Sequence, residues 1–322
     1  RVYQLFKIGR KLASSGAIDT INEVYNVPTA IKVFFDFLSF GSKKKNINIS
    51  KKSGEKLCDA LEGMGTTFIK LGQFLATRPD IIGEDMANDL VKLQDKLPAF
   101  NNNQAKQIIR HELGELQFKN IINLSEPIAA ASIAQVHTAT INVEGKDREI
   151  AIKILRPNIE KLFNEELDAL MLFAYLIEST VSKAKRLKLV EVVHLLREIT
   201  NMEMDLRFEA AAANELYENT KNDLGFNVPK IYWDYTTKRI LTLDKVDGVS
   251  IRELKAIKDS GIDLKKLAEN LIQHFLKQAV RDGFFHGDMH QGNLFVDQKG
   301  NIIPVDFGIM GRLDKNNRKY LA

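Results

Sequence analysis

One stretch near the C-terminal end of the sequence constrains the fold of this chain more than any other. Its polar residues are, in order, His286, Gly287, Asp288, Asn293 and Asp306. The apolar runs 294–296 and 302–305 lie between the last two of these residues. Runs of this length predict two short strands, which would fix the loops that carry the polar side chains.

The residue types in this stretch suit phosphoryl transfer. That reaction needs little covalent help from a protein and depends on positioning and on neutralising the charge of phosphate oxygens. Asp288 is placed to accept a proton from, or to orient, an attacking hydroxyl or water. Asn293 and Asp306 offer hard oxygen ligands that suit magnesium. The sequence therefore predicts ATP and Mg²⁺ as cofactors.

Either acidic motif alone could be merely a turn or the end of a strand. Their order, and a third motif upstream, favour a kinase-type site: the predicted strand 149–155 carries Lys153 after three apolar residues. In kinases such a lysine meets the α and β phosphates and is steadied by a glutamate on a helix. Spacing alone does not choose its partner among Glu165, Glu166 and Glu209.

Two further segments are candidates for contact with the nucleotide. Between two β-like segments lies an alanine-rich turn, with candidate residues Ala129, Ala130, Ala131 and Ser132. Small residues let backbone N–H groups approach phosphate, although alanine restricts the backbone more than glycine does. By itself an alanine run is also typical of helices and of tight packing. Residues 244–248 fit a hinge between two lobes, with Asp244 and Val246 beside the adenine.

Helical periodicity dominates the rest of the chain. Residues 1–41 alternate apolar and basic positions, typical of helices that dock on the protein's own core or lie on anionic lipid. A strong apolar repeat predicts one helix from Ser53 to about Arg78, on which Lys70 and Gln73 share a side. Further helices are expected at 84–97, 103–113, 157–182, 189–217 and 264–281, and strands at 228–234 and 239–243.

The composition is that of a globular protein, with 322 residues of which 44% are hydrophobic. This length suits two lobes and an extension. We expect N-terminal amphipathic helices and a basic linker, a helical extension, an N-lobe with a helical insertion, and an incomplete C-lobe, at 1–52, 53–125, 126–244 and 245–322.

Composition also excludes several classes of protein. A single cysteine excludes an internal disulfide framework, and the six histidines show no zinc spacing. The net charge of +4 is modest, and with no DNA or RNA motif in the sequence we expect no nucleic acid partner. No signal peptide and no apolar run long enough to span a bilayer is present. The sequence begins at Arg1 without an initiator methionine, so we expect a fragment of a longer protein.

The motifs of this chain closely resemble those of the UbiB-type, or ADCK-like, atypical kinases that support ubiquinone biosynthesis. The resemblance runs from about residue 55 to 312 and rests on motifs that general kinases lack. These are the KxGQ motif at 70–73, the alanine turn that ends in Gln135-Val136-His137, and the ExD motif at 203–205. Ala134 stands where many members of the family have glycine.

The resemblance implies a role for each matching residue. Lys153 would contact the phosphates and pair with Glu209, Asp288 would be the catalytic aspartate, and Asn293 and Asp306 would hold the metal. In the family the KxGQ helix folds over the active site and blocks protein substrates. Its lysine there meets the ExD acids, so regulatory roles would fall to Lys70, Gln73, Glu203 and Asp205.

The sequence therefore predicts an α+β, two-lobed, protein-kinase-like fold with an all-helical N-terminal extension packed over the active site. The resemblance implies a Mg²⁺-dependent ATPase of quinone lipid biosynthesis, with membrane lipid, quinone precursors and quinone biosynthesis proteins as partners. The intact protein would associate with the cytoplasmic face of the bacterial inner membrane. Two alternatives remain: a small-molecule phosphotransferase of the aminoglycoside or choline kinase type, and a non-catalytic, nucleotide-sensing lipid scaffold.

Overall fold

The computed structural model describes residues 2–15, 29, 33, 52–93, 97–180 and 182–321. Its internal contacts group the chain into two compact units. Unit 1 comprises residues 1–98, 131–133 and 156–201, and unit 2 comprises residues 99–130, 134–155 and 202–322. The four ranges expected from the sequence stay a prediction. Most of the proposed N-terminal helices and basic linker lie outside the described residues.

Unit 1 is built from helices. They are α1 (Val2–Ser14), α4 (Ser53–Met64), α5 (Thr66–Ala76), α6 (Pro79–Ile82), α7 (Glu84–Leu90), α9 (Ile159–Thr180), the 3-10 helix η1 (Ser182–Leu187) and most of α10 (Leu189–Glu203). Helices α4, α5 and α7 pack on one another, and α1 packs on α9. Met64, Phe68 and Leu90 are almost fully buried among them. This apolar packing is the main stabilising contribution in the unit.

The single helix predicted from Ser53 to Arg78 is wrong, because Gly65 divides it into α4 and α5. Gly65 has a φ of 100°, a conformation that glycine adopts without strain and that ends α4. A second glycine, Gly72 of the KxGQ motif, is required for packing. A side-chain carbon there would lie 2.3 Å from Leu93 Cδ1 and 2.8 Å from Leu61 Cδ1. The glycine of the motif thus lets α5 pack closely on its neighbours.

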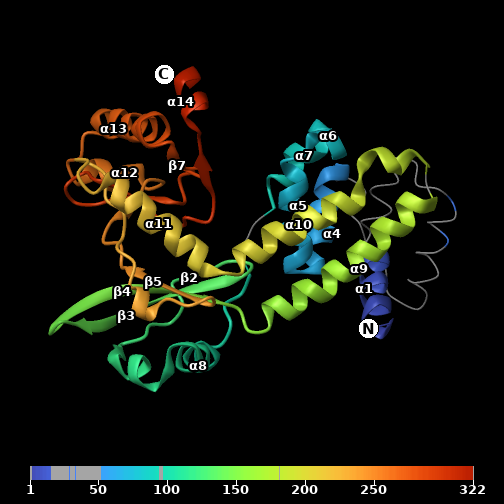
Figure 1. Ribbon diagram of the computed structural model, residues 1–322, viewed down its shortest axis with the longest axis horizontal. Coiled ribbons are helices and arrows are strands. Elements are labelled where there is room, and N and C mark those ends of the chain that lie inside the picture. Colours follow the sequence, from blue (N-terminus) through green and yellow to red (C-terminus); the bar gives the residue numbers. More distant parts are fainter. Residues whose placement is uncertain are drawn as a thin grey trace. The chain divides into compact units, whose positions relative to one another are not determined.

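Unit 2 begins with a five-stranded antiparallel sheet. Its strands are β1 (Ile121–Ile122), β2 (Ala129–Ala130), β3 (Ala134–Val143), β4 (Lys146–Leu155) and β5 (Ile240–Asp244). Their order is β1-β3-β4-β5, and β2 also pairs with β3. Helix α8 (Asn102–Asn120) lies along one face of the long β3–β4 hairpin (Figure 1). Ala105 and Ile109 of α8 and the isoleucines of β4 form one buried core.

Strand β4 has the alternation that its sequence predicts. Ile150, Ile152 and Ile154 are fully buried on the face covered by α8. Because neighbouring residues of a strand point to opposite faces, Lys153 lies on the other face of the sheet. The register sets Lys153 opposite Val136 of β3 and Leu241 of β5. Burial of the isoleucines therefore also determines which way Lys153 points.

Short strands and helices complete unit 2. They are the 3-10 helix η2 (Trp233–Tyr235), α11 (Leu206–Thr220), β6 (Val249–Ser250), α12 (Leu254–Asp259), α13 (Leu264–Leu276), β7 (Phe284–His286), β8 (Leu294–Val296), β9 (Ile302–Pro304), β10 (Met310–Arg312) and α14 (Lys315–Leu321). Strands β6, β8 and β9 form one small sheet, and β7 and β10 another. The two strands predicted around the acidic loops are therefore confirmed as β8 and β9.

Several predicted boundaries are wrong for local physical reasons. The helix expected over 189–217 is divided at Asp205, whose side chain caps the start of α11. The bounds expected for the helix over 264–281 are confirmed: α13 begins at Leu264, continues as a π-helix, η3 (Lys277–Asp282), and ends at Gly283, which is in the left-handed conformation. The helix expected over 84–97 ends early, at Leu90. The helix expected over 103–113 does end at Gly114, where the backbone is not helical, but a second helical segment that was not expected continues α8 to Asn120.

The strand expected over 228–234 is also wrong. Only one isolated bridge, between Ile231 and Leu243, and the 3-10 helix η2 occur there. No helix among the described residues is long and apolar enough to cross a membrane.

Candidate active site

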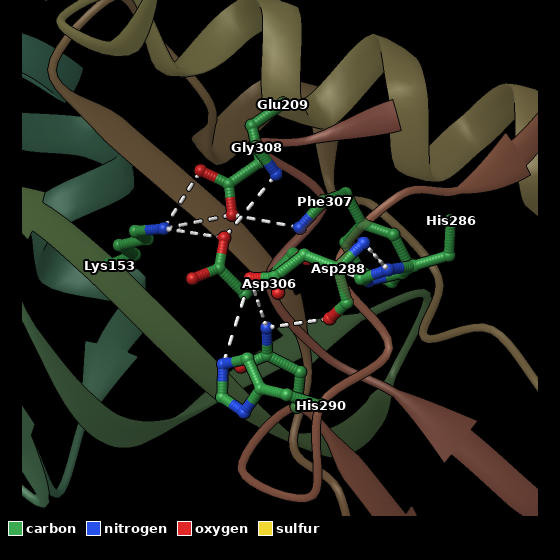
Figure 2. Close-up of polar contacts among 9 residues, drawn as sticks. Lys153, Glu209, His286, Asp288, His290, Asp306, Phe307 and Gly308 are labelled. Carbon is green, nitrogen blue, oxygen red and sulfur yellow. Dashed lines mark hydrogen bonds and ion pairs between the residues drawn. The ribbon is translucent and has the colours of Figure 1, made fainter. Parts of the chain in front are cut away.

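The lysine of β4 forms an ion pair with a glutamate of α11. Lys153 Nζ lies 2.9 Å from Oε1 and 2.8 Å from Oε2 of Glu209 (Figure 2). The same Nζ lies 3.7 Å from Oδ1 of Asp306. Glu209 also accepts a 3.4 Å hydrogen bond from the backbone N–H of Phe307. Of the three glutamates that spacing left open, the structure thus brings Glu209 to the lysine.

The charges of this pair are set by competing effects. Burial opposes the charge of Lys153, but the carboxylates of Asp306 and Glu209 outweigh it and raise the pKa of the lysine. The ammonium is therefore charged at neutral pH. Burial raises the pKa of Glu209 above its usual value, because it outweighs the positive charge of Lys153, which lowers that pKa. A charged lysine held in this way is suited to bind an anion such as a phosphate.

Asp306 follows β9 in an unusual backbone conformation. Its φ of 65° lies in the left-handed region, which few residues other than glycine adopt and which often marks functional sites. Its carbonyl oxygen lies 2.8 Å from Nε2 of His286, and its Oδ1 accepts a 3.3 Å hydrogen bond from the N–H of Gly308. The side chain of Asp306 is 53% exposed, so its carboxylate is accessible to a ligand.

His286 links the two acidic loops. Its Nδ1 accepts a 3.1 Å hydrogen bond from the backbone N–H of Asp288, so the ring proton belongs on Nε2, which donates to Asp306. Burial lowers the pKa of His286, which keeps this neutral form. Its own backbone N–H donates to Oε1 of Gln278 in the π-helix η3. Local departures from α-helical geometry of this kind often occur at functional sites.

Asp288 and Asn293 are joined within the next loop. The amide Nδ2 of Asn293 donates 3.1 Å hydrogen bonds to the backbone oxygen and to Oδ2 of Asp288. Nε2 of His290 lies 3.6 Å from the same Oδ2. Figure 2 shows His290 beside Asp288. Contacts within unit 2 therefore connect six of the predicted residues, which are Lys153, Glu209, His286, Asp288, Asn293 and Asp306.

The oxygen atoms of this site fit a magnesium ion bound together with phosphate. Because Nδ2 of Asn293 bonds Asp288, its Oδ1 is the atom that can bind a cation, and Asp306 supplies an accessible carboxylate. The described residues contain no group of three or more His, Cys, Asp or Glu side chains that could form a closed metal cage. Magnesium typically takes only one or two protein oxygens and completes its shell with phosphates and water. The donor set of Asn293 and Asp306 matches that preference.

The alanine-rich turn is held by an arginine that the sequence analysis missed. Nε and Nη2 of Arg156 donate to the carbonyl oxygen of Ala131 at 3.1 and 2.8 Å. Its guanidinium also donates to the carbonyl oxygens of Leu97 and Pro98. Ser132 is fully buried. Ala129 and Ala130, also proposed as nucleotide contacts, form the short strand β2.

Two buried polar side chains of β3 form a second network that sequence analysis did not identify. Gln135 accepts a 2.8 Å hydrogen bond from the backbone N–H of Phe100 and lies 2.8 Å from Nε2 of His137. Nδ1 of His137 lies 2.9 Å from the carbonyl oxygen of Ser125. Both side chains are fully buried, and burial lowers the pKa of His137. The signal was available in the sequence, because polar residues on a long strand of a buried sheet require internal partners.

The predicted hinge lines a cavity in unit 2. Asp244 and Val246 contribute to this cavity of about 380 Å³, together with residues of α11 and the segment 226–229. Asp244 accepts hydrogen bonds from the backbone N–H of Lys230 and from the hydroxyl of Tyr232. Neither Lys153 nor Asp306 lines the cavity, so it is distinct from the part of the site that these two residues form.

The proposed regulatory residues belong to different units. Lys70 and Gln73, both partly buried, lie on α5 of unit 1, whereas Glu203 and Asp205 belong to unit 2. Asp205 has a local function, because it caps α11 by accepting from the backbone N–H of Arg207 and pairs with the guanidinium of that residue. Arg207 lowers the pKa of Asp205. Glu203 contributes to the raised pKa of Lys153. The regulatory contact of Lys70 with these acids stays a prediction.

A sheet lysine paired with a helix glutamate, followed by loops that carry Asp, Asn and Asp, is the architecture of protein-kinase-like enzymes. Residues 92–322 match the ABC1 atypical kinase-like domain, and the chain belongs to that family. The predicted α+β, kinase-like fold class is thereby confirmed. Packing of the helical extension over the active site stays a prediction.

Several relatives are named "Probable protein kinase UbiB". The protein of that name from Marinobacter nauticus is 38% identical over 100% of this chain and 58% of its own length. The one from Azotobacter vinelandii is 40% identical over 82% of this chain and 49% of its own length. The chain thus spans about half the length of the curated relatives it matches. A solved complex of Rv3197 with erythromycin from Mycobacterium tuberculosis has 28% identity and a TM-score of 0.50, covering 76% of this chain and 59% of its own.

Proposed function

We propose that this chain is an ATP- and Mg²⁺-dependent phosphoryl-transfer enzyme or ATPase. The observation that carries the proposal is the ion pair of Lys153 with Glu209, with Asp306 3.7 Å from the same ammonium. This arrangement leaves a charged lysine beside an accessible carboxylate, as a site for phosphate and a metal ion requires. The bound ion would neutralise charge on the phosphate oxygens.

The residues of the chain would divide the work between them. Lys153 would bind phosphate oxygens, and Glu209 would keep its ammonium in place. Asn293 and Asp306 would hold the metal ion. Asp288, whose carboxylate is oriented by the amide of Asn293, would accept the proton of the attacking hydroxyl or water. His286 would keep both acidic loops in register without exchanging a proton itself, because both its nitrogens bond backbone groups.

We further propose that the intact protein acts in quinone lipid biosynthesis at the cytoplasmic face of the bacterial inner membrane. The name shared by relatives at 38–40% identity supports this role. Membrane lipid, quinone precursors and proteins of quinone biosynthesis would be its partners. Lys70 and Gln73 of α5 would regulate the site through Glu203 and Asp205, as the motifs of the family imply.

One observation favours a second candidate function, that of a small-molecule phosphotransferase. The Rv3197 structure that resembles this chain was solved as a complex with erythromycin, a small molecule. Such an enzyme would place phosphate on a soluble metabolite and would not need Lys70. A labelled phosphate found on a metabolite, with Lys70→Ala as active as the wild type, would favour this function over the first.

The test is ATP turnover by the purified 322-residue chain, with Mg²⁺, with vesicles of phosphatidylglycerol and with a phenol as acceptor mimic. We expect turnover that Asp306→Asn reduces by roughly 100-fold or more, because the variant loses the carboxylate that binds the metal ion. Glu215→Gln, which removes a partly exposed carboxylate of α11 that pairs with Arg312, serves as the control. If the wild type shows no turnover above Asp306→Asn under any of these conditions, the proposal is wrong.

A further inference from the structure

Two basic groups lie over a glycine of the catalytic loop, and the phosphate chemistry proposed above does not use them. A side-chain carbon at Gly292 would lie 2.6 Å from Nη2 of Arg252 and 2.6 Å from Cε1 of His290. The glycine therefore leaves room for both groups against the same part of the loop. Arg252 belongs to the segment between β6 and α12, so the fold of unit 2 brings it to this place.

The guanidinium of Arg252 is exposed and available to a ligand. Within the described residues, Arg252 hydrogen-bonds only through its backbone N–H, which donates to Oγ of Ser250 at 3.4 Å. A guanidinium carries five donors in a planar fork that matches a carboxylate or a phosphate. On most of a protein surface such a group is merely solvated. Here it lies beside the residues that line the reaction site.

His290 connects this arginine with the catalytic aspartate. Its Nδ1 accepts a 2.9 Å hydrogen bond from the N–H of Gly292, so in the neutral ring the proton is on Nε2. That Nε2 lies 3.6 Å from Oδ2 of Asp288. The ring thus extends from the place where Arg252 lies to the carboxylate that would receive the acceptor's proton. A molecule whose hydroxyl meets Asp288 would therefore extend past His290 toward Arg252.

We propose that Arg252 binds an anionic group, a carboxylate or a phosphate, of the acceptor molecule, and that His290 lines the same site. The inference rests on the proposed function and names the class of its acceptor. A charged donor distinguishes acceptors by their charge, because an uncharged hydroxyl compound gains no charge-assisted hydrogen bond from the guanidinium. The anion can belong to a soluble acceptor or to a phospholipid headgroup, since both present the same chemistry.

The first experiment measures direct binding by isothermal titration calorimetry, with and without Mg²⁺ and a non-hydrolysable ATP analogue. The probes are 4-hydroxybenzoate and its uncharged counterpart 4-hydroxybenzamide. We expect the wild type to bind the carboxylate about tenfold more tightly than the amide, which corresponds to one charge-assisted hydrogen bond of about 1.4 kcal/mol. Arg252→Gln should abolish that difference and Arg252→Lys should keep part of it. Lys255→Gln, which removes an exposed cation of neighbouring α12, should match the wild type.

A second experiment distinguishes a lipid source of the anion. Co-sedimentation compares vesicles of phosphatidylglycerol with vesicles of uncharged phosphatidylcholine, using the same variants. A loss of preference for phosphatidylglycerol in Arg252→Gln but not in Lys255→Gln would identify a headgroup as the anion. If Arg252→Gln matches the wild type in both experiments while its thermal unfolding is unchanged, the inference is overturned.

ATP turnover of the wild type is measured separately, so that the two proposals can fail independently. Binding that depends on Arg252 in a chain without ATP turnover would leave the anion site standing and refute the proposed function. Turnover without any preference that depends on Arg252 would refute the anion site alone.

Discussion

The imidazole of His286 donates a 2.8 Å hydrogen bond from Nε2 to the carbonyl oxygen of Asp306. Its other nitrogen accepts from the backbone of Asp288, so one buried ring holds both acidic loops. The two carboxylates of the proposed reaction are therefore positioned by hydrogen bonds of this ring with the backbone, and His286 itself would touch neither ATP nor acceptor. His286 is a positioning residue in this sense.

Replacement of His286 should reduce turnover much more than ATP binding. His286→Leu keeps the bulk of the ring but loses both hydrogen bonds, which releases Asp288 and Asp306 from their fixed geometry. We expect kcat to fall about 100-fold, since small displacements of catalytic groups have effects of this size, with the Kd of ATP changing less than threefold. Single-turnover kinetics and equilibrium ATP binding measure the two effects. His194→Leu, at an exposed position of α10, is the control; an equal loss of kcat and ATP affinity in His286→Leu would contradict the positioning role.

Breaking the ion pair of Lys153 and Glu209 should lower both the stability of the fold and its affinity for ATP. Glu209→Gln keeps the shape of the side chain but removes the closest carboxylate from the mostly buried ammonium of Lys153, whose remaining ion-pair partner is the more distant Asp306. Breaking one side of a buried ion pair typically costs about 3 kcal/mol, and we expect a loss of unfolding free energy of that order. ATP should bind at least about tenfold more weakly, because the ammonium is no longer held in place.

Urea unfolding and ATP titration measure these two losses. Glu215→Gln on the same helix removes only a surface pair with Arg312 and should change the unfolding free energy by less than about 1 kcal/mol. Equal stability of Glu209→Gln and Glu215→Gln would show that the buried pair does not stabilise the fold.

The buried histidine of β3 predicts a loss of stability in acid. Burial lowers the pKa of His137 in the folded protein below its ordinary value near 6.5. Above that value both folded and unfolded states hold a neutral ring, so the stabilising contribution is fully present. As the pH falls below 6.5, this histidine binds a proton in the unfolded state but stays neutral in the folded state. The unfolding free energy then decreases by up to about 1.4 kcal/mol per pH unit for this one group.

Urea unfolding of wild type and His137→Asn between pH 8 and pH 5.5 measures this contribution. His274 and His286 also have lowered pKa values in the folded state, so the unfolding free energy of both proteins should fall with decreasing pH. The fall should be steeper for the wild type, because its unfolding takes up about one proton more than the unfolding of His137→Asn. Identical slopes for the two proteins would show that His137 takes up its proton in the folded state.

Sequence patterns predicted the strands whose formation depends on residues close together in the sequence. The alternation of isoleucines in β4 determines which face carries Lys153, and the two short apolar runs between Asn293 and Asp306 form β8 and β9. Periodicity failed where one residue ends a helix within an otherwise continuous apolar repeat. Gly65 and Asp205 are such residues, since a left-handed glycine and a capping carboxylate leave the repeat on either side intact.

Partners distant in sequence could not be chosen in this way. Glu209 is 56 residues from Lys153, and spacing alone does not select it over Glu165 and Glu166; the family resemblance implied this partner, and the fold brings it to the lysine. The carbonyl oxygens that Arg156 binds are 25 to 59 residues away. Because every residue has a backbone carbonyl, no residue type in the sequence indicates these contacts. The sequence therefore indicates which residue types the site contains, while the contacts that position them follow from the fold.

At position 156 we expect lysine to be a poor replacement for arginine, although both side chains are positively charged. Its guanidinium donates to three carbonyl oxygens, of Leu97, Pro98 and Ala131, and a lysine ammonium cannot reproduce that planar fork. We expect Arg156→Lys to lose about 1–3 kcal/mol of unfolding free energy, since hydrogen bonds to charged groups contribute about that much. ATP should also bind several-fold more weakly, because the carbonyl of Ala131 belongs to the turn proposed to cover the phosphates.

Urea unfolding and ATP titration measure both effects, with Arg148→Lys at an exposed position of β4 as the matched control. Unchanged stability in Arg156→Lys would mean that charge alone holds the turn, and unchanged ATP affinity in a destabilised variant would place the turn outside the nucleotide site.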